Sequence, residues 1–295
     1  MSACLALLMA TLPPPPVAPP LPAAARYLSQ RPPGEVPERF APPQLTGFSH
    51  LGRCAFSPDG RECWFTLSSP DYVPCRLMVT RYERGAWTTP QPAPFTEGLE
   101  NSAEPWFTPD GQHLVFTAAV KGSKSGTDFW RVDRTAQGWG PPVRLPEPLN
   151  SEADDFCYSQ RPDGTVHFLS SRGGSAQVHI ARPKGDRFEV QAVHLPTHGL
   201  SRFEGDPAVP ADGRWMVFYT ARPGGFGRVD LMVAFADGKG GWTVPMNLGP
   251  DFNTKAEEFG ATVSTDGQYL FFTRHSREKS ELWWVSTMAI DRLRK

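Results

Sequence analysis

Residues 54–60 read Cys-Ala-Phe-Ser-Pro-Asp-Gly, and this stretch returns four more times in altered form. The related stretches are Pro-Trp-Phe-Thr-Pro-Asp-Gly at 105–111, Tyr-Ser-Gln-Arg-Pro-Asp-Gly at 158–164, Pro-Ala-Val-Pro-Ala-Asp-Gly at 207–213 and Ala-Thr-Val-Ser-Thr-Asp-Gly at 261–267. Their final glycines are separated by 51, 53, 49 and 54 residues. A regular spacing of this length is typical of a repeat protein in which each repeat forms one small structural unit.

An apolar run suited to a β-strand follows each Asp-Gly pair. These runs are Cys-Trp-Phe-Thr at 63–66, Leu-Val-Phe-Thr at 114–117, Val-His-Phe-Leu at 166–169, Met-Val-Phe-Tyr at 216–219 and Tyr-Leu-Phe-Phe at 269–272. Strand, tight turn and strand is the economical interpretation, because glycine adopts positive φ easily and aspartate hydrogen-bonds the nearby backbone. We therefore assign the five aspartates a structural role in the turns.

A second landmark recurs half a repeat later, where a tryptophan is followed three residues on by a proline. The pairs are Trp87 with Pro90, Trp139 with Pro142 and Trp242 with Pro245. This pattern predicts a turn into a fourth, outer strand, because proline is tolerated at the edge of a sheet. The third repeat differs, since it has Phe188 and no proline at the corresponding place.

The two chain ends complement each other. Residues 38–46 resemble a spare outer strand, with Phe40 and Pro43 at the same spacing, and the last repeat ends after 281–287 without an outer strand of its own. Pairing these segments closes a ring and removes two exposed sheet edges. The sequence thus predicts an all-β, five-bladed β-propeller of four-stranded antiparallel blades over residues 34–295. Six blades are the alternative and would need an extra unit in the proline-rich leader.

The Ser-Pro-Asp-Gly turn at 57–60 and the Phe-Thr ending that follows it resemble the PD40, or WD40-like, propeller repeat of TolB and other bacterial envelope proteins. Residues 222–231 resemble the inter-strand loop of such repeats, and 150–152 and 253–258 resemble the segment that leads into the next blade. The resemblance covers about residues 37–290. It implies a periplasmic or secreted binding or scaffold module whose partner is a protein or a small polar or carbohydrate ligand. TolB itself carries a separate N-terminal domain and six blades, so this chain departs from it.

Composition excludes several classes of function. The 295-residue chain has a formal net charge of −1, so it carries no basic field that would attract nucleic acid or an anionic membrane. No apolar run reaches the 18 residues of a transmembrane helix.

The N-terminal 33 residues differ from the repeats. Residues 2–12 are apolar and small, and 13–22 are mostly proline. The apolar stretch is typical of a secretory signal, although its basic n-region is missing. We expect export to the periplasm or medium and a disordered leader over 1–33. A proline-rich tail on a cytoplasmic protein is the alternative.

Cysteine spacing predicts no metal site. Outside the leader stand Cys54, Cys63, Cys75 and Cys157, without the paired spacing of zinc ligands. In an exported protein Cys63 could pair with Cys54 or Cys75. Buried free thiols are the other interpretation, and the sequence leaves this open.

Acidic residues precede the first strand of four repeats, and in a propeller the first strand lines the central channel. The candidates for one channel mouth are Glu104, Asp154, Asp155, Glu204, Asp206, Glu257 and Glu258, with Arg53 in the first repeat. A concave mouth lined by one sign of charge attracts a cation or a basic or polyhydroxyl ligand. The alternative is a structural role, in which these carboxylates accept backbone N–H bonds between blades.

The sequence identifies no reaction. A binding or scaffold module is the function we expect, without a cofactor. The alternative is a carbohydrate-active hydrolase that uses the same carboxylates as acid and nucleophile or base, roughly 5–10 Å apart. Nucleophilic catalysis has little support, because no Gly-x-Ser-x-Gly elbow is present.

Overall fold

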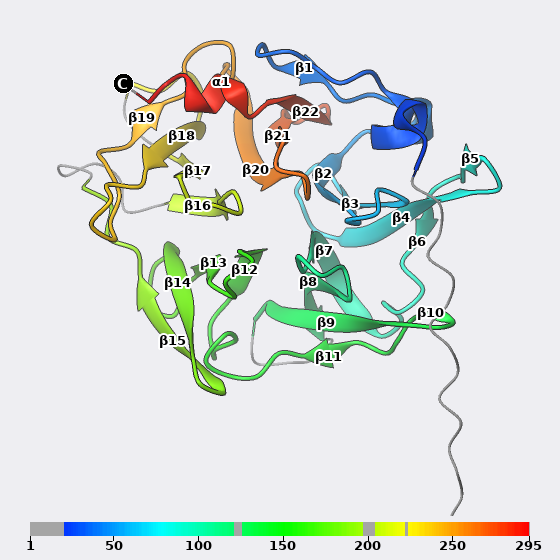
Figure 1. The fold of residues 1–295 in the computed structure, drawn as a ribbon, viewed down its shortest axis with the longest axis horizontal. Coiled ribbons are helices and arrows are strands. Elements are labelled where there is room, and N and C mark those ends of the chain that lie inside the picture. Colours follow the sequence, from blue (N-terminus) through cyan, green and yellow to red (C-terminus); the bar gives the residue numbers. More distant parts are fainter. Residues whose placement is uncertain (1–20, 121–125, 197–203, 222–223, 295) are drawn as a thin grey trace, which may run out of the picture.

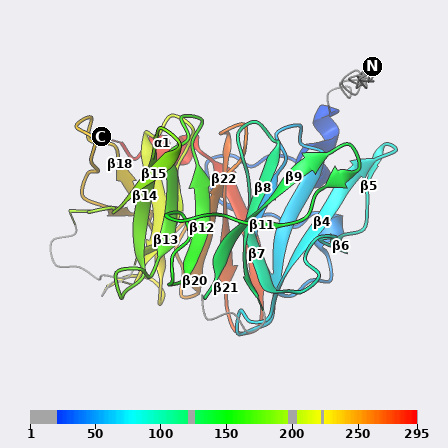
Figure 2. The same cartoon turned by 90° about the horizontal axis from the view of Figure 1, so that it is seen from below.

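The computed structural model describes residues 21–120, 126–196, 204–221 and 224–294. Within them, five antiparallel sheets are arranged in a ring around a central axis (Figure 1), and their strands run roughly along that axis (Figure 2). The predicted five-bladed propeller is confirmed, and the six-bladed alternative is wrong. The apolar leader 1–20 and the loop residues 222–223 lie outside the described residues.

The blades follow one another along the chain. Blade 1 consists of β2 (Leu51–Phe56), β3 (Glu62–Ser68), β4 (Cys75–Glu83), β5 (Ala86–Trp87) and β6 (Gln91–Pro92). Blade 2 consists of β7 (Leu99–Phe107), β8 (His113–Val120), β9 (Asp128–Thr135), β10 (Gly138–Trp139) and β11 (Val143–Arg144). Blade 3 consists of β12 (Asp155–Gln160), β13 (Val166–Ser170), β14 (Gln177–Lys184) and β15 (Arg187–Ala192).

The last two blades complete the ring. Blade 4 consists of β16 (Glu204–Ala208), β17 (Trp215–Thr220), β18 (Asp230–Phe235) and β19 (Met246–Asn247). Blade 5 consists of β20 (Glu257–Val263), β21 (Tyr269–His275), β22 (Ser280–Ser286) and the N-terminal β1 (Glu38–Arg39). The first strand of each repeat, namely β2, β7, β12, β16 or β20, is innermost (Figure 1).

The Asp-Gly turns join the first and second strands of every blade. In each turn the aspartate accepts the N–H of the residue two positions later, at 3.0–3.1 Å, in the pairs Asp59–Arg61, Asp110–Gln112, Asp163–Thr165, Asp212–Arg214 and Asp266–Gln268. The glycines all have positive φ, between 67° and 82°. These contacts give the five aspartates the structural role that the sequence predicts.

Proline decides the form of the outer strands. In blades 1 and 2 the outer strand is divided, since β5 and β6 pair with β4, and β10 and β11 pair with β9. Pro90 and Pro142 stand at these interruptions, because proline has no N–H to donate to the neighbouring strand. Blade 3 lacks the proline, and its outer strand β15 pairs without a break along β14.

The N-terminal strand closes the ring. Glu38 and Arg39 pair with Trp284 and Trp283 of β22, and the N–H of Phe40 donates to the carbonyl of Leu282 at 2.8 Å. The strand is shorter than the expected 38–46, because prolines follow it and η2 (Pro43–Leu45) is a 3-10 turn. Figure 1 shows β1 beside β22 at the junction of the chain ends.

Residues 21–33 depart from the expectation that the whole leader stays outside the fold. Tyr27 and Leu28, in η1 (Ala23–Ser29), are buried against Phe56, Phe271 and Trp284. The Tyr27 hydroxyl donates to Asp266 Oδ2 at 2.6 Å. This segment, residues 21–29, is called the N-terminal clasp below. The sequence predicts a disordered leader over 1–33, and that prediction is wrong for the clasp because Tyr27 and Leu28 are part of the core.

In the part of the chain that the structure describes, the hydrophobic core is divided into five clusters, and each fills the space between two neighbouring blades. Trp64 of blade 1, for example, packs with Phe116 of blade 2.

The four described cysteines are free thiols, which answers the disulfide question that the sequence leaves open. Among the described residues, no helix has the length and apolar character that crossing a membrane requires.

Candidate functional site

One repeat position projects into the channel from every blade. It lies seven residues before the turn glycine and is occupied in order by Arg53, Glu104, Cys157, Asp206 and Gly260. The pairing between first and second strands shifts register at each of these residues, which marks a β-bulge. Four of the five have positive φ, of 56°, 60°, 53° and 66° from Glu104 onward. Non-glycine residues in this conformation are strained and often serve a function.

Three of these side chains meet in the channel. The Cys157 thiol donates to Asp206 Oδ1 at 2.6 Å and lies 3.1 Å from Glu104 Oε1. Each carboxylate also binds the bulge of the next blade, since Glu104 Oε2 accepts the N–H of Cys157 at 2.8 Å and Asp206 Oδ2 accepts the N–H of Gly260 at 2.7 Å. The cluster therefore ties neighbouring blades together at the channel wall.

Burial makes this cluster hard to ionise. It raises the pKa of Glu104, and the negative charge of Asp206 raises it further. Burial also raises the pKa of Asp206, and it holds the pKa of the Cys157 thiol well above its ordinary value. Like charges in a poorly solvated place resist joint ionisation. The groups of this cluster therefore keep their protons more tightly than exposed groups of the same kind do.

Arg53 crosses the channel next to the cluster. Its Nε donates to Thr262 Oγ1 of blade 5 at 2.9 Å, and its Nη2 donates to the carbonyl of Tyr158 in blade 3 at 3.1 Å. Its guanidinium stands 5.6 Å from the ring centre of Trp106 in blade 2. Among the described residues, neither Glu104 nor Asp206 forms an ion pair with Arg53, although its charge partly lowers both pKa values.

A cavity of about 510 Å³ opens from the cluster toward the end of the channel where the first strands begin. We call it the acidic cavity. Its lining includes Glu104, Asp206 and Glu257, together with the aromatic residues Tyr72, Tyr219 and Phe259. Tyr72 and Phe259 meet edge to face at 5.5 Å between ring centres. This size and this mixture of apolar walls with a few polar groups are typical of small-molecule sites.

Glu257 at the edge of the acidic cavity is already paired. Its oxygens accept two N–H bonds from Arg228, at 2.6 and 2.8 Å, and the hydroxyl of Tyr72 at 3.1 Å. The bond from Arg228 lowers the pKa of Glu257. Glu257 is therefore ionised at the edge, whereas Glu104 and Asp206 retain protons more strongly inside.

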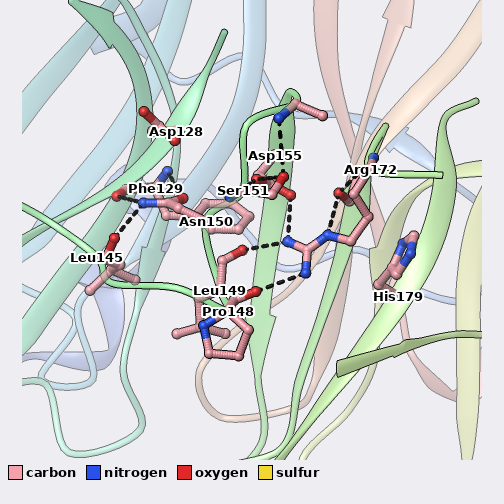
Figure 3. Close-up of polar contacts among 12 residues, drawn as sticks. Asp128, Phe129, Leu145, Pro148, Leu149, Asn150, Ser151, Asp155, Arg172 and His179 are labelled. Atoms are coloured by element: carbon pink, nitrogen blue, oxygen red, sulfur yellow. Dashed lines mark hydrogen bonds and ion pairs between the residues drawn. The ribbon is translucent and has the colours of Figure 1, made fainter. Parts of the chain in front are cut away.

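Two other candidate residues are part of joints between blades. Asp155 accepts the N–H and hydroxyl of Ser151 and an ion pair from Arg172 at 2.8 Å. Arg172 also donates to the carbonyls of Pro148 and Leu149, as Figure 3 shows.

The same joint recurs in blade 5, where Glu258 binds Thr254 and pairs with Arg274 at 2.9 Å. Both carboxylates are fully buried, at 0 % exposure. Neither lines the acidic cavity.

The remaining candidates also lie away from the cavity lining. Asp154 accepts the N–H of Thr127 at 2.7 Å, and Glu204 begins β16 opposite Thr220. The structure thus brings Glu104, Asp206 and Glu257 together in the lining of one cavity. Arg53 lies next to the Glu104 cluster but outside that lining.

Sequence reasoning missed Cys157 and the aromatic wall. Cys157 was treated as a buried thiol, although it occupies the same repeat position as Glu104 and Asp206. Counting back seven residues from each turn glycine would have found it. Tyr72 and Tyr219 come from a loop and from the end of β17, and no repeat signal in the sequence marks them.

The cluster also has the residue types of a metal site, since one oxygen or sulfur atom from each of Glu104, Cys157 and Asp206 lies within 4.8 Å of the others. The sulfur–oxygen separations of 2.6 and 3.1 Å, however, are those of direct contacts. Ligands around one zinc ion stand farther apart, because each lies roughly 2.0–2.3 Å from the metal on a different side. A hydrogen-bonded thiol accounts for the geometry.

Replacing Glu104 by glutamine is expected to stabilise the protein at neutral pH. The folded-state pKa of Glu104 is raised, so the native state binds its proton more tightly than the unfolded chain does. Stability of the parent protein therefore falls as pH rises from about 4, the ordinary glutamate value, through the raised pKa. Glutamine keeps the oxygen that accepts the Cys157 N–H and carries no charge. Urea unfolding between pH 4 and 8 measures the difference, which should grow with pH.

Glu257→Gln is the control, and its expected effect on stability at neutral pH has the opposite sign. The pKa of Glu257 is lowered by Arg228, so its contribution to stability is present at neutral pH and lost in acid. The Glu257 variant should be less stable than the parent at pH 7 and should converge with it in acid. A Glu104 variant that also loses stability at neutral pH would contradict the charge argument.

No family model matches the chain, and no curated protein matches it. Solved structures show the same fold. The putative TolB of Agrobacterium tumefaciens has a TM-score of 0.53 and 12% identity, over 82% of this chain and 78% of that one. TolB from Acinetobacter baumannii has a TM-score of 0.50 and 19% identity, over 80% and 54%. The tricorn protease has a TM-score of 0.51 and 16% identity, over 78% and 21%.

These similarities place the chain in the class of β-propeller proteins, with TolB-type structures among its neighbours. The chain spans about half the length of the Acinetobacter protein and about a fifth of the tricorn protease. At such low identities the likeness concerns the fold, which hosts both binding modules and enzymes.

Proposed function

We propose that this protein is a propeller-type binding module whose acidic cavity takes a ligand with a primary ammonium group. The observation that carries the proposal is the pair Glu104 and Asp206, which faces a 510 Å³ cavity without an ion-paired cation among the described residues. Buried carboxylates are usually paired, so the buried Asp206 and the partly buried Glu104, which both face the cavity, favour a cationic ligand.

The cavity wall fits the same ligand class. Tyr72, Tyr219 and Phe259 contribute aromatic side chains to the lining of the same cavity as Glu104 and Asp206. An ammonium group is attracted both to carboxylates and to the faces of aromatic rings. Arg228, in contrast, is held at the edge by Glu257 and leaves the inner pair to the ligand.

The alternative, a carbohydrate-active hydrolase, has less support. A glycosidase needs space for the sugar between its two carboxyl groups, which stand about 5 Å or more apart. Here the Cys157 sulfur lies between Glu104 and Asp206 and contacts both. Their bonds to the backbone of Cys157 and Gly260 also fix them to the wall. This arrangement favours a binding site over a catalytic pair.

Calorimetric titration of the whole protein with 1,5-diaminopentane tests the proposal. We expect binding at neutral pH with release of protons, because a bound ammonium group favours the ionised form of the cluster. Two buffers of different ionisation enthalpy measure that release. Asp206→Asn and Glu104→Gln should each weaken binding by about tenfold or more, since each removes one buried charge from the pair.

Glu152→Gln is the matched control, because it removes an exposed carboxylate that lies two residues before Asp154 and outside the cavity lining. It should bind like the parent. Absence of amine binding at millimolar concentration, or equal affinity in all variants, would refute the proposal. Binding of neutral oligosaccharides in place of amines would favour the hydrolase class.

We also propose export and a TolB-type scaffold role, on the apolar stretch at 2–12 and the repeat resemblance. Expression in a Gram-negative host followed by fractionation should give a periplasmic product whose N-terminus lies after the apolar stretch. A full-length product in the cytoplasm would refute export and leave the binding proposal untouched.

A further inference from the structure

The acidic cavity has charged groups of different sign at its inner end and at its edge. At the inner end stand Glu104 and Asp206, and Asp206 is 6 % exposed. At the edge, the side chain of Arg228 is 73 % exposed, and Arg228 is the only basic residue among the described residues that line the cavity. The proposed binding of an ammonium group uses the inner end alone. The edge therefore has a cation without an assigned role.

The backbone of the loop before β18 places Arg228 at the edge. Asp230 accepts the N–H of Phe226 at 2.8 Å and the N–H of Gly227 at 2.9 Å. A Cβ atom at residue 227 would stand 1.9 Å from the carbonyl oxygen of Ala256, so glycine lets the loop lie against the segment that leads into blade 5. These contacts hold the backbone beside Arg228 without using its side chain.

Arg228 has hydrogen-bond donors to spare, whereas its partner Glu257 is largely occupied. A guanidinium carries five N–H groups, and a carboxylate accepts about four hydrogen bonds. The Nε and Nη2 atoms of Arg228 each donate to Glu257, and no described residue accepts a hydrogen bond from Nη1. The oxygens of Glu257 accept these two bonds and a third from the hydroxyl of Tyr72. The edge therefore favours a ligand group that accepts hydrogen bonds from Arg228.

The rest of the cavity lining is mainly apolar. Phe156, Leu169, Ala176, Val229 and Phe259 belong to it. Such walls favour methylene groups, because removing hydrocarbon from water lowers the free energy. The volume of about 510 Å³ leaves room for a chain of several carbon atoms.

We infer that the ligand of the acidic cavity is an ω-amino acid, a molecule in which a hydrocarbon chain separates an ammonium group from a carboxylate. The inference rests on the proposed function, because the ammonium group lies at Glu104 and Asp206. The carboxylate lies at the edge and accepts hydrogen bonds from the N–H groups of Arg228 that Glu257 leaves free. Arginine suits this task, because its planar guanidinium presents N–H pairs that match a carboxylate.

Three probes with one ammonium group and five carbon atoms test the inference on the whole protein: 5-aminopentanoate, 5-aminopentanamide and pentylamine. They differ in the tail, which is anionic, neutral and polar, or apolar. In calorimetric titrations at low salt, the acid should bind about fivefold more tightly than the amide, the upper range for an ion pair that water reaches. This advantage should shrink at high salt, which screens exposed charges. 4-Aminobutanoate and 6-aminohexanoate, each with its amide, extend the comparison to a shorter and a longer chain.

Two variants at the edge should change the preference for the acid in opposite directions. Arg228→Met removes the cation and leaves Glu257, so the acid should bind more weakly than the amide. Glu257→Gln removes the neighbouring carboxylate and leaves the charge of Arg228, so the ratio of acid to amide affinity should rise above that of the parent. If the two residues formed only a structural ion pair, both variants would break the same contact and would shift this ratio in the same direction.

Arg187→Met is the matched control, because Arg187 is an exposed arginine of β15 that lies outside the cavity lining. It should keep the parental ratio of affinities, and thermal unfolding should show that all three variants are folded. The inference is wrong if none of the three acids binds more tightly than its amide, or if Arg228→Met retains the parental preference. Binding of the amides and pentylamine without an advantage for the acids overturns the ω-amino acid alone, whereas failure of every ammonium probe at millimolar concentration overturns the proposed function as well.

Discussion

Replacement of Trp284 by alanine is expected to lower the free energy of unfolding by about 3–5 kcal/mol, the range for truncating a buried aromatic residue. Trp284 has 0 % exposure and lies where the ring closes. It stacks on Phe271 at 5.3 Å between ring centres, and Phe40 and Tyr27 lie at 5.0 and 5.4 Å. The substitution therefore weakens β1, the N-terminal clasp and the last blade together.

Chemical denaturation followed by circular dichroism measures the effect of Trp284→Ala. Met288→Ala is the control, because Met288 is a nearby apolar residue that is 55 % exposed. It should change the free energy of unfolding by less than about 0.5 kcal/mol. A Trp284 variant as stable as the Met288 variant would show that the chain ends contribute little to the ring.

Replacement of Arg172 by methionine is expected to destabilise the protein by about 3–5 kcal/mol, because it leaves a buried charge without its partner. Asp155 loses its ion pair, and the carbonyls of Pro148 and Leu149 lose their donors. Figure 3 shows how the guanidinium joins these groups. The loss should loosen the joint between blades 2 and 3.

A double variant separates charge from packing. Arg172→Met with Asp155→Leu removes both charges and should recover a large part of the lost stability, as measured by urea unfolding. Lys184→Met is the control for an exposed ion pair, since Lys184 and Glu189 are both mostly exposed. It should cost less than about 1 kcal/mol. A double variant less stable than Arg172→Met alone would show that Asp155 acts through its bonds to Ser151.

The sequence predicts the ring well because its signals are local and repeated. An Asp-Gly turn fixes the register of one hairpin wherever it occurs, and the proline after Trp87 or Trp139 divides an outer strand in each case. Closure by residues 38–39 followed from a missing outer strand. The N-terminal clasp was not predicted because it directly follows a proline-rich stretch that is typical of a disordered leader, and no repeat landmark marks its core residues.

The sequence predicts the site only in part, because the position of an acidic residue in the repeat does not say which way its side chain points. All the acidic candidates except Asp154 lie within a first strand, and adjacent residues on a strand face opposite sides. Asp155 and Glu258 turn toward the joints between blades, while Asp206 turns into the channel. A bulge decides this direction, and the sequence marks the bulge only through its distance from the turn glycine.

The N-terminal clasp and β1 bear on how the chain folds as it is made. Both lie against β21 and β22, the last two strands of the described chain, so the clasp and β1 must wait until blade 5 has been synthesised to find their partners. Contacts between such distant parts of a chain form slowly, because a long loop must close first. Until then the apolar face of blade 1 that packs against blade 5 and the aromatic residue of the clasp are exposed, and a nascent chain is open to chaperones and to aggregation at that stage.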